Sequence, residues 1–550
     1  MNSLLFNKQI DELATKIEEG SRANKGNIDR FSEPAEGTLR RSKAKRHHII
    51  FGRRGSGKSS LLYKAADDLT KDTHPVALID LEPFKGHLYP DIIISVLIAS
   101  FKKYKSWIQR VINSDIGTRS WKNIWLKKKY SRKTEKYVEL KKRIDKEIDE
   151  LLEQLYLTDN ADLKKNLYDH LKNETTEELK SRIDTSRISI EALINQAVAK
   201  SKGTELQEEF KRNKKEYLLR KIIDYQSIFT DLYQIENRHS FLLLDDLYHI
   251  NEVDQPSLID YFHRISKGNE LWIKIATIRN RTTWYKENPQ PIGIKIGDDA
   301  DEINLDLTLE KFSTTKDFLA SLLKRYIKDT NAPDLDNILA EGGLDRLVLA
   351  SGGVTRDFLG LFWRSITEAK ERLQRSDGDH HRGPKIGAED VNLAAGSYGE
   401  IKREEFQKDS PEDRRELENA FNKVKEFCLE NTKKSIFLYD QEDQSKDSEL
   451  LKQLIDLRLL HQVKSRVTVR SRTGKIYRAY LLDVSQYTGE RARRDVEIIE
   501  FWKAKDKDIL RLASLIFDPS LKQDKTQKGR KVKKNTSQEK PDNKQTKFNF

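Results

Sequence analysis

The chain has 550 residues, of which 36% are hydrophobic and 35% are charged, and its formal net charge is +13. This length allows roughly two to four domains, and the composition is typical of a protein with a large solvated surface rather than of a fibrous or membrane protein. No apolar run reaches the roughly 20 residues that span a bilayer, the N-terminus lacks a signal-peptide pattern, and the single cysteine, Cys428, excludes an intramolecular disulfide. We therefore expect a cytoplasmic location and no membrane partner.

Residues 1–44 are predicted to hold one amphipathic helix, which ends near Gly20, and an irregular leader. In residues 45–310, short apolar runs such as "HHIIFG", "PVALIDLE", "SFLLLDD" and "LWIKIATIR" alternate with helical stretches. Runs that are apolar on both faces are typical of strands inside a parallel sheet. We therefore predict an α/β fold, a doubly wound parallel sheet, for this region.

Residues 102–220 have a different composition, with little glycine and many Lys and Glu residues. Apolar residues follow one another there at steps of three or four, which is the spacing of one helix face: Leu140, Ile144, Ile148, Leu151 and Leu155. We predict a helical hairpin or short coiled coil inserted into the α/β domain.

Three tryptophans at the start of this insertion are interleaved with Lys and Arg, namely Trp107, Trp121 and Trp125. Such a pattern occurs where aromatic rings stack on nucleic-acid bases. An amphipathic helix that packs its tryptophans inward has the same pattern, and the sequence leaves both interpretations open.

The C-terminal half is divided by composition into four regions. Residues 311–375 are predicted to form an all-helical lid, and residues 376–409 a linker. Residues 410–505 have helices followed by two alternating strands about a turn with Gly474, which suggests a winged helix. Residues 506–550 are predicted to be a basic disordered tail.

The sequence "GRRGSGKSS" follows a predicted strand and begins a helix, and it fits the phosphate-binding pattern GxxxxGK[ST]. Its glycines let the backbone N–H groups face phosphates, Lys58 reaches the β and γ oxygens, and the Ser59 hydroxyl binds Mg²⁺. The predicted nucleotide-binding residues of the loop are Gly52, Arg53, Arg54, Gly55, Ser56, Gly57, Lys58, Ser59 and Ser60.

Two adjacent carboxylates, Asp245 and Asp246, end the apolar run "FLLLDD". A phosphate loop needs carboxylates at the end of a neighbouring buried strand, to hold Mg²⁺ and to position the attacking water. We predict that Asp245 contributes to the Mg²⁺ shell and that Asp246 orients or deprotonates the water. ATP and Mg²⁺ are thus the expected cofactors.

The order of "GRRGSGKS", "LLLDD", "KIATIR", a helical lid with "GGVTR" and a C-terminal winged helix resembles AAA+ P-loop ATPases of the initiator type, relatives of the origin-recognition complex that include bacterial members. The resemblance covers about residues 45–360 and, more loosely, 410–505. It implies that Thr277 or Arg279 senses the γ-phosphate, that Arg356 closes the lid on the nucleotide, and that Arg264 is an arginine finger for an adjacent subunit.

The sequence departs from that family in three ways. Asp246 stands where many relatives have Glu, and its side chain is one methylene shorter, so hydrolysis is expected to be slow. The insertion separates the two motifs widely, as it does in the KAP class, and "TIR" is similar to a motif of the signalling STAND ATPases. These departures support an alternative: a STAND-like or KAP-like signalling ATPase whose insertion and winged helix bind proteins.

Basic residues crowd the predicted hairpin of the winged helix: Lys464, Arg466, Arg470, Arg472, Lys475 and Arg478. Residues 521–550 add ten Lys/Arg and three Asp/Glu, about half of the net charge of +13. The helix before the hairpin, "DSELLKQLIDLRLL", is poor in residues that read bases, so we expect contacts to phosphates and weak sequence specificity. The leading hypothesis is a nucleotide-dependent switch on double-stranded DNA, and homo-oligomers or partner proteins are compatible with it.

Overall fold

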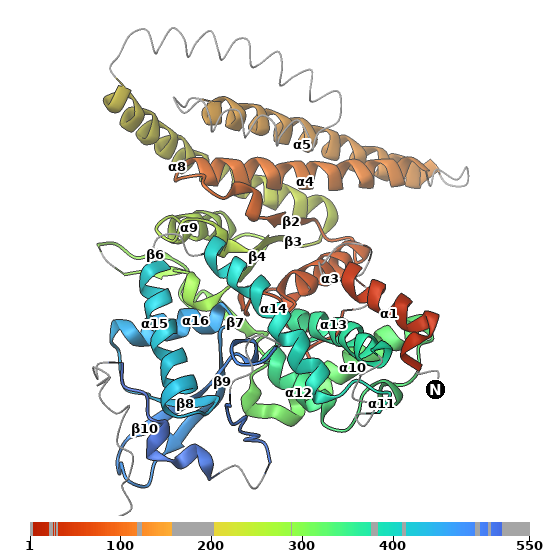
Figure 1. The fold of residues 1–550 in the computed structure, drawn as a ribbon. Helices are drawn as coiled ribbons and strands as arrows, with labels where there is room; N and C mark the ends of the chain where they lie inside the picture. Colours follow the sequence, from red (N-terminus) through yellow and green to blue (C-terminus); the bar gives the residue numbers. More distant parts are fainter. Residues whose placement is uncertain are drawn as a thin grey trace, which may run out of the picture.

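In the computed structural model, the described residues are 4–20, 26, 28, 31–117, 124–156, 203–287, 289–375, 383–409, 414–489, 495–503 and 508–519. The three regions that these residues form are a central sheet with a long helical arm, a helical lid, and a C-terminal region with a small antiparallel sheet (Figure 1). None of the described helices is both long enough and apolar enough to cross a membrane.

The central sheet has five parallel strands. In spatial order they are β2 (Val76–Asp80), β3 (Ser240–Asp245), β4 (Leu271–Thr277), β1 (His47–Phe51) and β7 (Ala300–Asn304). Every pair of neighbours is parallel, so the carboxyl ends of all five strands meet at one edge. Ligands of open α/β sheets bind at that edge.

Helices cover both faces of the sheet. Adjacent residues of β1 enter different cores: Ile50 packs with α3 (Lys58–Lys71) and near α2 (Thr38–Ser42), whereas Ile49 packs with α4 (Asp91–Gly117) and α9 (Gln255–Ser266). A short hairpin, β5 (Tyr285–Lys286) and β6 (Ile292–Gly293), lies beside α9. The predicted doubly wound α/β class is confirmed.

The helical arm consists of α4, α5 (Ile124–Tyr156) and α8 (Gly203–Glu236), which lie above the sheet in Figure 1. The predicted apolar face of α5 is buried in the arm, because Leu140, Ile144, Ile148, Leu151 and Leu155 all belong to its core. Residues 157–202 of the predicted insertion lie outside the described residues.

The predicted boundaries of the insertion, 102 and 220, are wrong, since both fall inside continuous helices. α4 begins against β2, where Ile92, Ile93 and Ile94 are buried, and runs on into the arm without a glycine or proline to interrupt it. Trp107 is buried and packs edge-on against Tyr137, so its ring faces inward. Trp121 and the side chain of Trp125 lie outside the described residues.

The lid contains α10 (Phe312–Thr330), α11 (Leu335–Ile338), α12 (Gly343–Ser351) and α13 (Thr355–Gln374). The N-terminal helix α1 (Lys8–Glu19) packs against α10 and α13. Its buried residues Ile10, Leu13 and Ile17 belong to the same apolar core as the lid. The N-terminal helix is therefore a structural part of the lid.

The predicted linker, 376–409, is wrong over most of its length, because α14 (Ala388–Asp409) is a helix packed against α12 and α13. Two glycines weaken its helical pattern, and both are needed for close packing. A Cβ on Gly396 would lie 2.6 Å from the Cα of Gly489, and one on Gly399 would lie 2.8 Å from the Cβ of Ser485. Tertiary contacts thus override the local propensity.

The C-terminal region begins with α15 (Arg414–Glu426), whose last turn continues as a π-helical segment. It continues with β8 (Ile436–Asp440), α16 (Lys446–Asp456), β9 (Leu460–Thr468) and β10 (Ile476–Leu482). The strands form an antiparallel sheet in the order β8-β10-β9, and Gly474 has φ of +85° in the turn of the predicted hairpin.

The predicted start of the tail, residue 506, is wrong. Residues 508–519 include two short 3-10 turns and pack against the C-terminal sheet. Leu510, Leu515 and Phe517 are buried, and the ring of Phe517 lies 5.5 Å from that of Phe437. Burial of these three apolar side chains holds the segment on the sheet. Residues 520–550 lie outside the described residues.

Candidate nucleotide-binding site

The phosphate loop joins the end of β1 to the start of α3 at the carboxyl edge of the sheet. Gly55 and Gly57 have φ of +84° and +98°, a region in which other residues are strained. Gly52 is constrained by space, because a Cβ there would lie 2.3 Å from the Oγ of Ser56. Its N–H donates to the carbonyl of Thr277 at 3.2 Å, which fixes the start of the loop to the end of β4.

Lys58 begins α3 and is buried, with 5% of its surface exposed. Its Nζ donates to two main-chain carbonyls of the loop, those of Gly52 at 2.9 Å and Arg53 at 3.3 Å. Burial lowers the pKa of Lys58, and the nearby carboxylates of Asp246 and Asp245 oppose that shift. The ammonium is thus held inside the curl of the loop, where it can bind a phosphate oxygen.

The two carboxylates of the second motif lie beside the loop. Asp245, the last residue of β3, is buried, and burial together with the charge of Asp246 raises its pKa to about 7. The hydroxyl of Ser59 lies near Asp245 and opposes this shift. Asp246 has φ of +54°, and its backbone N–H donates to Oδ1 of Asp245 at 3.0 Å. The structure therefore brings both predicted motifs together.

These residues fit a magnesium ion bound together with a nucleotide. The donors are hard oxygens, the Ser59 hydroxyl and the Asp245 carboxylate, which Mg²⁺ prefers. Among the described residues, no group of three His, Cys, Asp or Glu side chains is arranged to hold a metal ion by itself. Mg²⁺ would therefore depend on phosphate oxygens and water for its other ligands. The Oγ of Ser56 is buried in the loop without a hydrogen-bond partner and is a further donor for a phosphate.

The two candidate sensors of β4 have different surroundings. The hydroxyl of Thr277 is buried and hydrogen-bonded to that of Thr282, at the end of the strand between β1 and β3. The guanidinium of Arg279 lies 4.0 Å from the ring centre of Phe51 and forms an ion pair with Glu302 of β7. Thr277 is thus the candidate at the centre of the sheet edge, whereas Arg279 is paired away from the loop.

Arg356 of the lid contacts the phosphate loop directly. Its backbone N–H donates to the carbonyl of Gly55 at 3.1 Å, and its charge helps to lower the pKa of Lys58. A Cβ on Gly55 would lie 2.7 Å from the Cβ of Arg356, so only glycine allows this approach. The other predicted loop residues, Arg54 and Ser60, are half-buried at the same edge.

Arg264 lies away from this site. It is near the C-terminal end of α9. The other end, Gln255, contacts the segment that follows β4 and lies about 13 Å away along the helix axis. Its guanidinium is half exposed and pairs with Asp260 at 2.7 Å. Arg264 thus lies outside the candidate nucleotide site of its own chain. An arginine finger acts on the site of a neighbouring subunit, so the predicted role is compatible with this position and stays a prediction.

Some residues of the site were missed by the sequence analysis. Asp80, the last residue of β2, pairs in register with Asp245, and burial raises its pKa with a further contribution from Asp246. The ring centre of Tyr248 lies 5.8 Å from Nζ of Lys58 and 5.5 Å from the guanidinium of Arg281. The only available signal was the position of Asp80 at the end of the apolar run "VALID".

The hairpin of β9 and β10 presents exposed cations around its turn. Four of them are exposed on β9 and the turn that follows it: Lys464, Arg466, Arg470 and Arg472. Arg478 is half-buried, and Lys475 pairs with Asp440 at 2.9 Å. In contrast, α16 turns its end toward the segment that follows β4, where the backbone N–H of Asn280 donates to Asp456 at 3.2 Å.

The sequence matches no family model and no curated protein. Among solved structures, the chain is similar to the Orc1 protein of Aeropyrum pernix in complex with DNA, with 12% identity and a TM-score of 0.31; the match covers 84% of this chain and 91% of that one. It is also similar to Cdc6p of Pyrobaculum aerophilum, with 12% identity and a TM-score of 0.28, over 81% and 87% of the two chains. The α/β assignment rests on the strand order and on the two motifs at one sheet edge.

Proposed function

We propose that the chain is an initiator-type AAA+ ATPase, which binds MgATP between the phosphate loop and the helical lid and hydrolyses it slowly. The observation that carries the proposal is the place of the buried Lys58 ammonium, which is held by carbonyls of Gly52 and Arg53 inside the loop and lies near the carboxylates of Asp246 and Asp245 at the end of β3. P-loop ATPases hold Mg²⁺ at that strand end. A chance glycine-rich turn would not require a buried lysine beside two carboxylates.

The residues of the site supply binding, orientation and charge. Backbone N–H groups of the loop and the ammonium of Lys58 bind the phosphates, and Arg356 contacts the same loop from the lid. Ser59 and Asp245 hold Mg²⁺, which neutralises charge on the phosphates. Asp246 orients the attacking water, and Thr277 is the candidate sensor of the γ-phosphate. The shorter side chain of Asp246, compared with Glu, limits how well the water is positioned.

Binding and hydrolysis of ATP test this proposal. We expect Lys58→Ala to abolish MgATP binding in isothermal titration, because the phosphates lose the ammonium that is held inside the curl of the loop. Asp246→Asn is expected to keep its MgATP affinity within about threefold of that of the wild type and to lose turnover by about 10²-fold or more. A turnover rate unchanged in Asp246→Asn would contradict the role of this carboxylate, and unchanged binding in Lys58→Ala would contradict the site.

We also propose that the C-terminal region is a winged helix that binds double-stranded DNA with low sequence specificity. The exposed cations of the hairpin support this, because phosphate contacts need charge and not base-reading groups. Replacing Arg470 by Ala is expected to weaken binding equally on unrelated DNA sequences and to reduce the slope of log affinity against log salt by about 1. The control is Lys475→Ala, whose cation is already paired with Asp440.

The second candidate is a signalling ATPase whose C-terminal region binds proteins. The inward ring of Trp107 and the contact of α16 with the ATPase region favour it, because both remove surfaces that would contact nucleic acid. The steady-state ATPase rate with and without double-stranded DNA separates the candidates, with Asp246→Asn as the blank. A higher ATPase rate in the presence of DNA supports the initiator-like function. An ATPase rate that DNA does not change, together with a DNA affinity that does not depend on salt, supports the signalling ATPase.

A further inference from the structure

Arg53, the second residue of the phosphate loop, does not extend toward the phosphates. It is 5% exposed, and its guanidinium lies among groups of the ATPase, the lid and the C-terminal region. Its Nη2 donates to the carbonyls of Leu307 at 2.8 Å and Gly352 at 3.0 Å. Its backbone N–H donates to Asp306 at 2.8 Å, and its Nε does so at 3.3 Å. Its Nη1 lies 3.4 Å from Nδ1 of His461 on β9.

The contact between Arg53 and His461 fixes the proton of the imidazole. A guanidinium only donates, so Nδ1 of His461 is the acceptor and Nε2 carries the proton. Nε2 then donates to Asp483 at 2.7 Å. His461 is fully buried, and burial lowers its pKa, which keeps the ring neutral. A Cβ on Gly352 would lie 2.0 Å from Nδ1, so glycine is required where the lid meets this ring.

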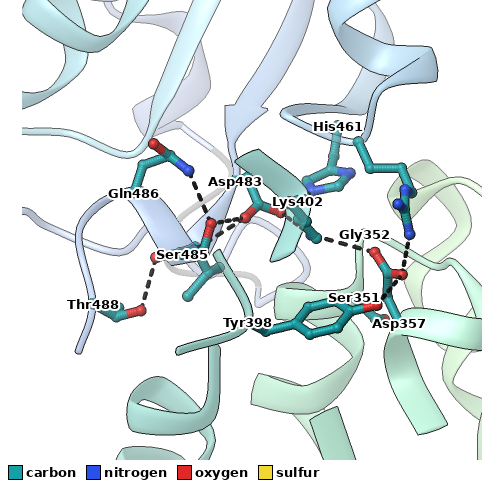
Figure 2. A network of polar contacts seen from close by, with 12 residues as sticks. Ser351, Gly352, Asp357, Tyr398, Lys402, His461, Asp483, Ser485, Gln486 and Thr488 are labelled. Carbon is teal, nitrogen blue, oxygen red and sulfur yellow. Dashed lines mark hydrogen bonds and ion pairs between the residues drawn. The ribbon is translucent and has the colours of Figure 1, made fainter. Parts of the chain in front are cut away.

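From His461 a chain of buried polar contacts leads through Asp483 and Lys402 to Asp357 (Figure 2). Lys402 of α14 lies between Asp483 and Asp357, with its Nζ 2.7 Å and 3.3 Å from their carboxylates. Asp357 also accepts from Tyr398 at 3.1 Å and pairs with Arg458. It follows directly on Arg356, whose N–H donates to Gly55. The C-terminal region therefore contacts the phosphate loop directly at Arg53 and is linked to it indirectly at Gly55, through Asp357 and Arg356 of the lid.

We propose that Arg53 is a positioning residue through which docking of the C-terminal region sets the nucleotide affinity of the phosphate loop. Its acceptor in that region is Nδ1 of His461, and the ion-pair chain through Lys402 holds the histidine in place. This inference rests on the proposed nucleotide binding. By thermodynamic linkage, MgATP then raises the equilibrium constant for docking of the C-terminal region, and docking raises the affinity for MgATP by the same factor.

The direction of the coupling follows from the side of the loop on which these contacts lie. Within the loop, the N–H of Ser56 donates to the carbonyl of Arg53 at 3.1 Å. The hydrogen bonds that Arg53 donates, and the one that Gly55 accepts from Arg356, hold the loop from outside and do not involve the N–H groups of Gly55 and Gly57. Docking therefore fixes the curl of the loop while leaving those donors for phosphates. A loop that is already ordered loses less conformational entropy when a ligand binds, so the docked form has the higher affinity.

A matched pair of variants at His461 tests the link. Asn places its side-chain oxygen near the position of Nδ1 and keeps an acceptor for Arg53, whereas Gln reaches the position of Nε2, keeps the donor to Asp483, and leaves Arg53 without its acceptor. We expect His461→Gln to weaken MgATP binding by about tenfold, and His461→Asn to stay within about threefold of the wild type, in titrations of the full chain carrying Asp246→Asn. Equal affinities in all three proteins, or equal losses in both variants, would overturn the proposal.

Hydrogen exchange of the full-length protein tests the reciprocal effect without a change at the interface. We expect MgATP to slow amide exchange of residues 459–463 and 398–402 by about tenfold, and to leave exchange of α5 unchanged. Exchange that MgATP slows only around the phosphate loop would overturn the coupling. If the protein carrying Asp246→Asn binds no MgATP at all, the nucleotide site itself is refuted. The two failures are thereby distinguished.

Discussion

Two buried lysines, Lys58 and Lys402, show how differently this protein treats charge in its interior. Both are almost fully buried. Lys58 donates only to neutral carbonyls of its own loop, at 2.9 and 3.3 Å, whereas Lys402 lies between two carboxylates, at 2.7 and 3.3 Å. The carboxylates near the two lysines also differ. Burial raises the pKa of Asp245 to about 7, whereas Lys402 and His461 hold the pKa of Asp483 well below its usual range.

The difference separates the candidate binding site from a structural clamp, the buried network of Asp357, Lys402, Asp483 and His461. At the sheet edge, burial makes each charge costly, and a bound anion and cation would each lower that cost. In the clamp, opposite charges already offset the cost of burial within the fold. Ionic groups placed between the lid and the C-terminal region make the position of that region depend on specific partners, which apolar packing alone would not do.

Breaking the clamp is expected to have the largest effect on stability. Lys402→Met leaves two buried carboxylates without their shared cation, so we expect the free energy of unfolding to fall by about 3–5 kcal/mol. Thermal unfolding of the transition that contains the C-terminal region measures this. The control is Lys475→Ala, an exposed lysine paired with Asp440, for which we expect no measurable change. A similar loss of unfolding free energy in both variants would show that the buried network stabilises the protein no more than an exposed ion pair does.

Neutralising Asp245 in the candidate binding site is expected to raise the free energy of unfolding, the opposite of the effect of Lys402→Met. Asp245→Asn keeps an acceptor for the N–H of Asp246 but removes a charge that burial disfavours. At pH 8 without nucleotide, we expect the free energy of unfolding to rise by about 1 kcal/mol, while Mg²⁺-dependent ATP binding is lost. Denaturant unfolding and titration with MgATP measure the two effects on the same sample. A destabilised variant would mean that Asp245 is a structural carboxylate like Asp483.

Asp456, at the end of α16, is expected to give the smallest effect and a pH dependence. Burial, together with the charge of Asp306, raises its pKa from 3.8 to about 7, and hydrogen bonds from Asn280 and the charge of Arg53 oppose the shift. Between these two values the folded protein holds a proton that the unfolded chain releases, so this contact loses stability as pH rises through that range.

Asp456→Asn removes this titration and keeps an acceptor for Asn280. We expect its midpoint of thermal unfolding to be about 2–4 °C above that of the wild type at pH 8, and the two midpoints to converge toward pH 4. Parallel midpoint curves over pH 4–8 would contradict the assignment. Scans at several pH values in one buffer series are sufficient to detect the difference.

The candidate site was largely predictable because its residues are close together in the sequence. The run Gly52–Ser59 sets its own backbone geometry, through glycines at positive φ and a helix that starts at Lys58. Asp245 follows a strand whose apolar composition is visible locally. The boundaries of the lid and C-terminal region were less predictable. Gly396 and Gly399 weaken the helical pattern of α14, and their reason, close approach to Gly489 and Ser485, comes from distant parts of the chain.

The sequence by itself determined the α/β class, the phosphate loop and the carboxylates Asp245 and Asp246, because strand periodicity and glycine conformation are local properties. Only the tertiary structure decided what Arg53 does. In the sequence it is one variable position of a motif, and its partners, Asp306, Gly352 and His461, come from three separate elements. A guanidinium bonds to whatever acceptors packing brings within about 3 Å, and local pattern cannot specify contacts between residues that are hundreds of positions apart.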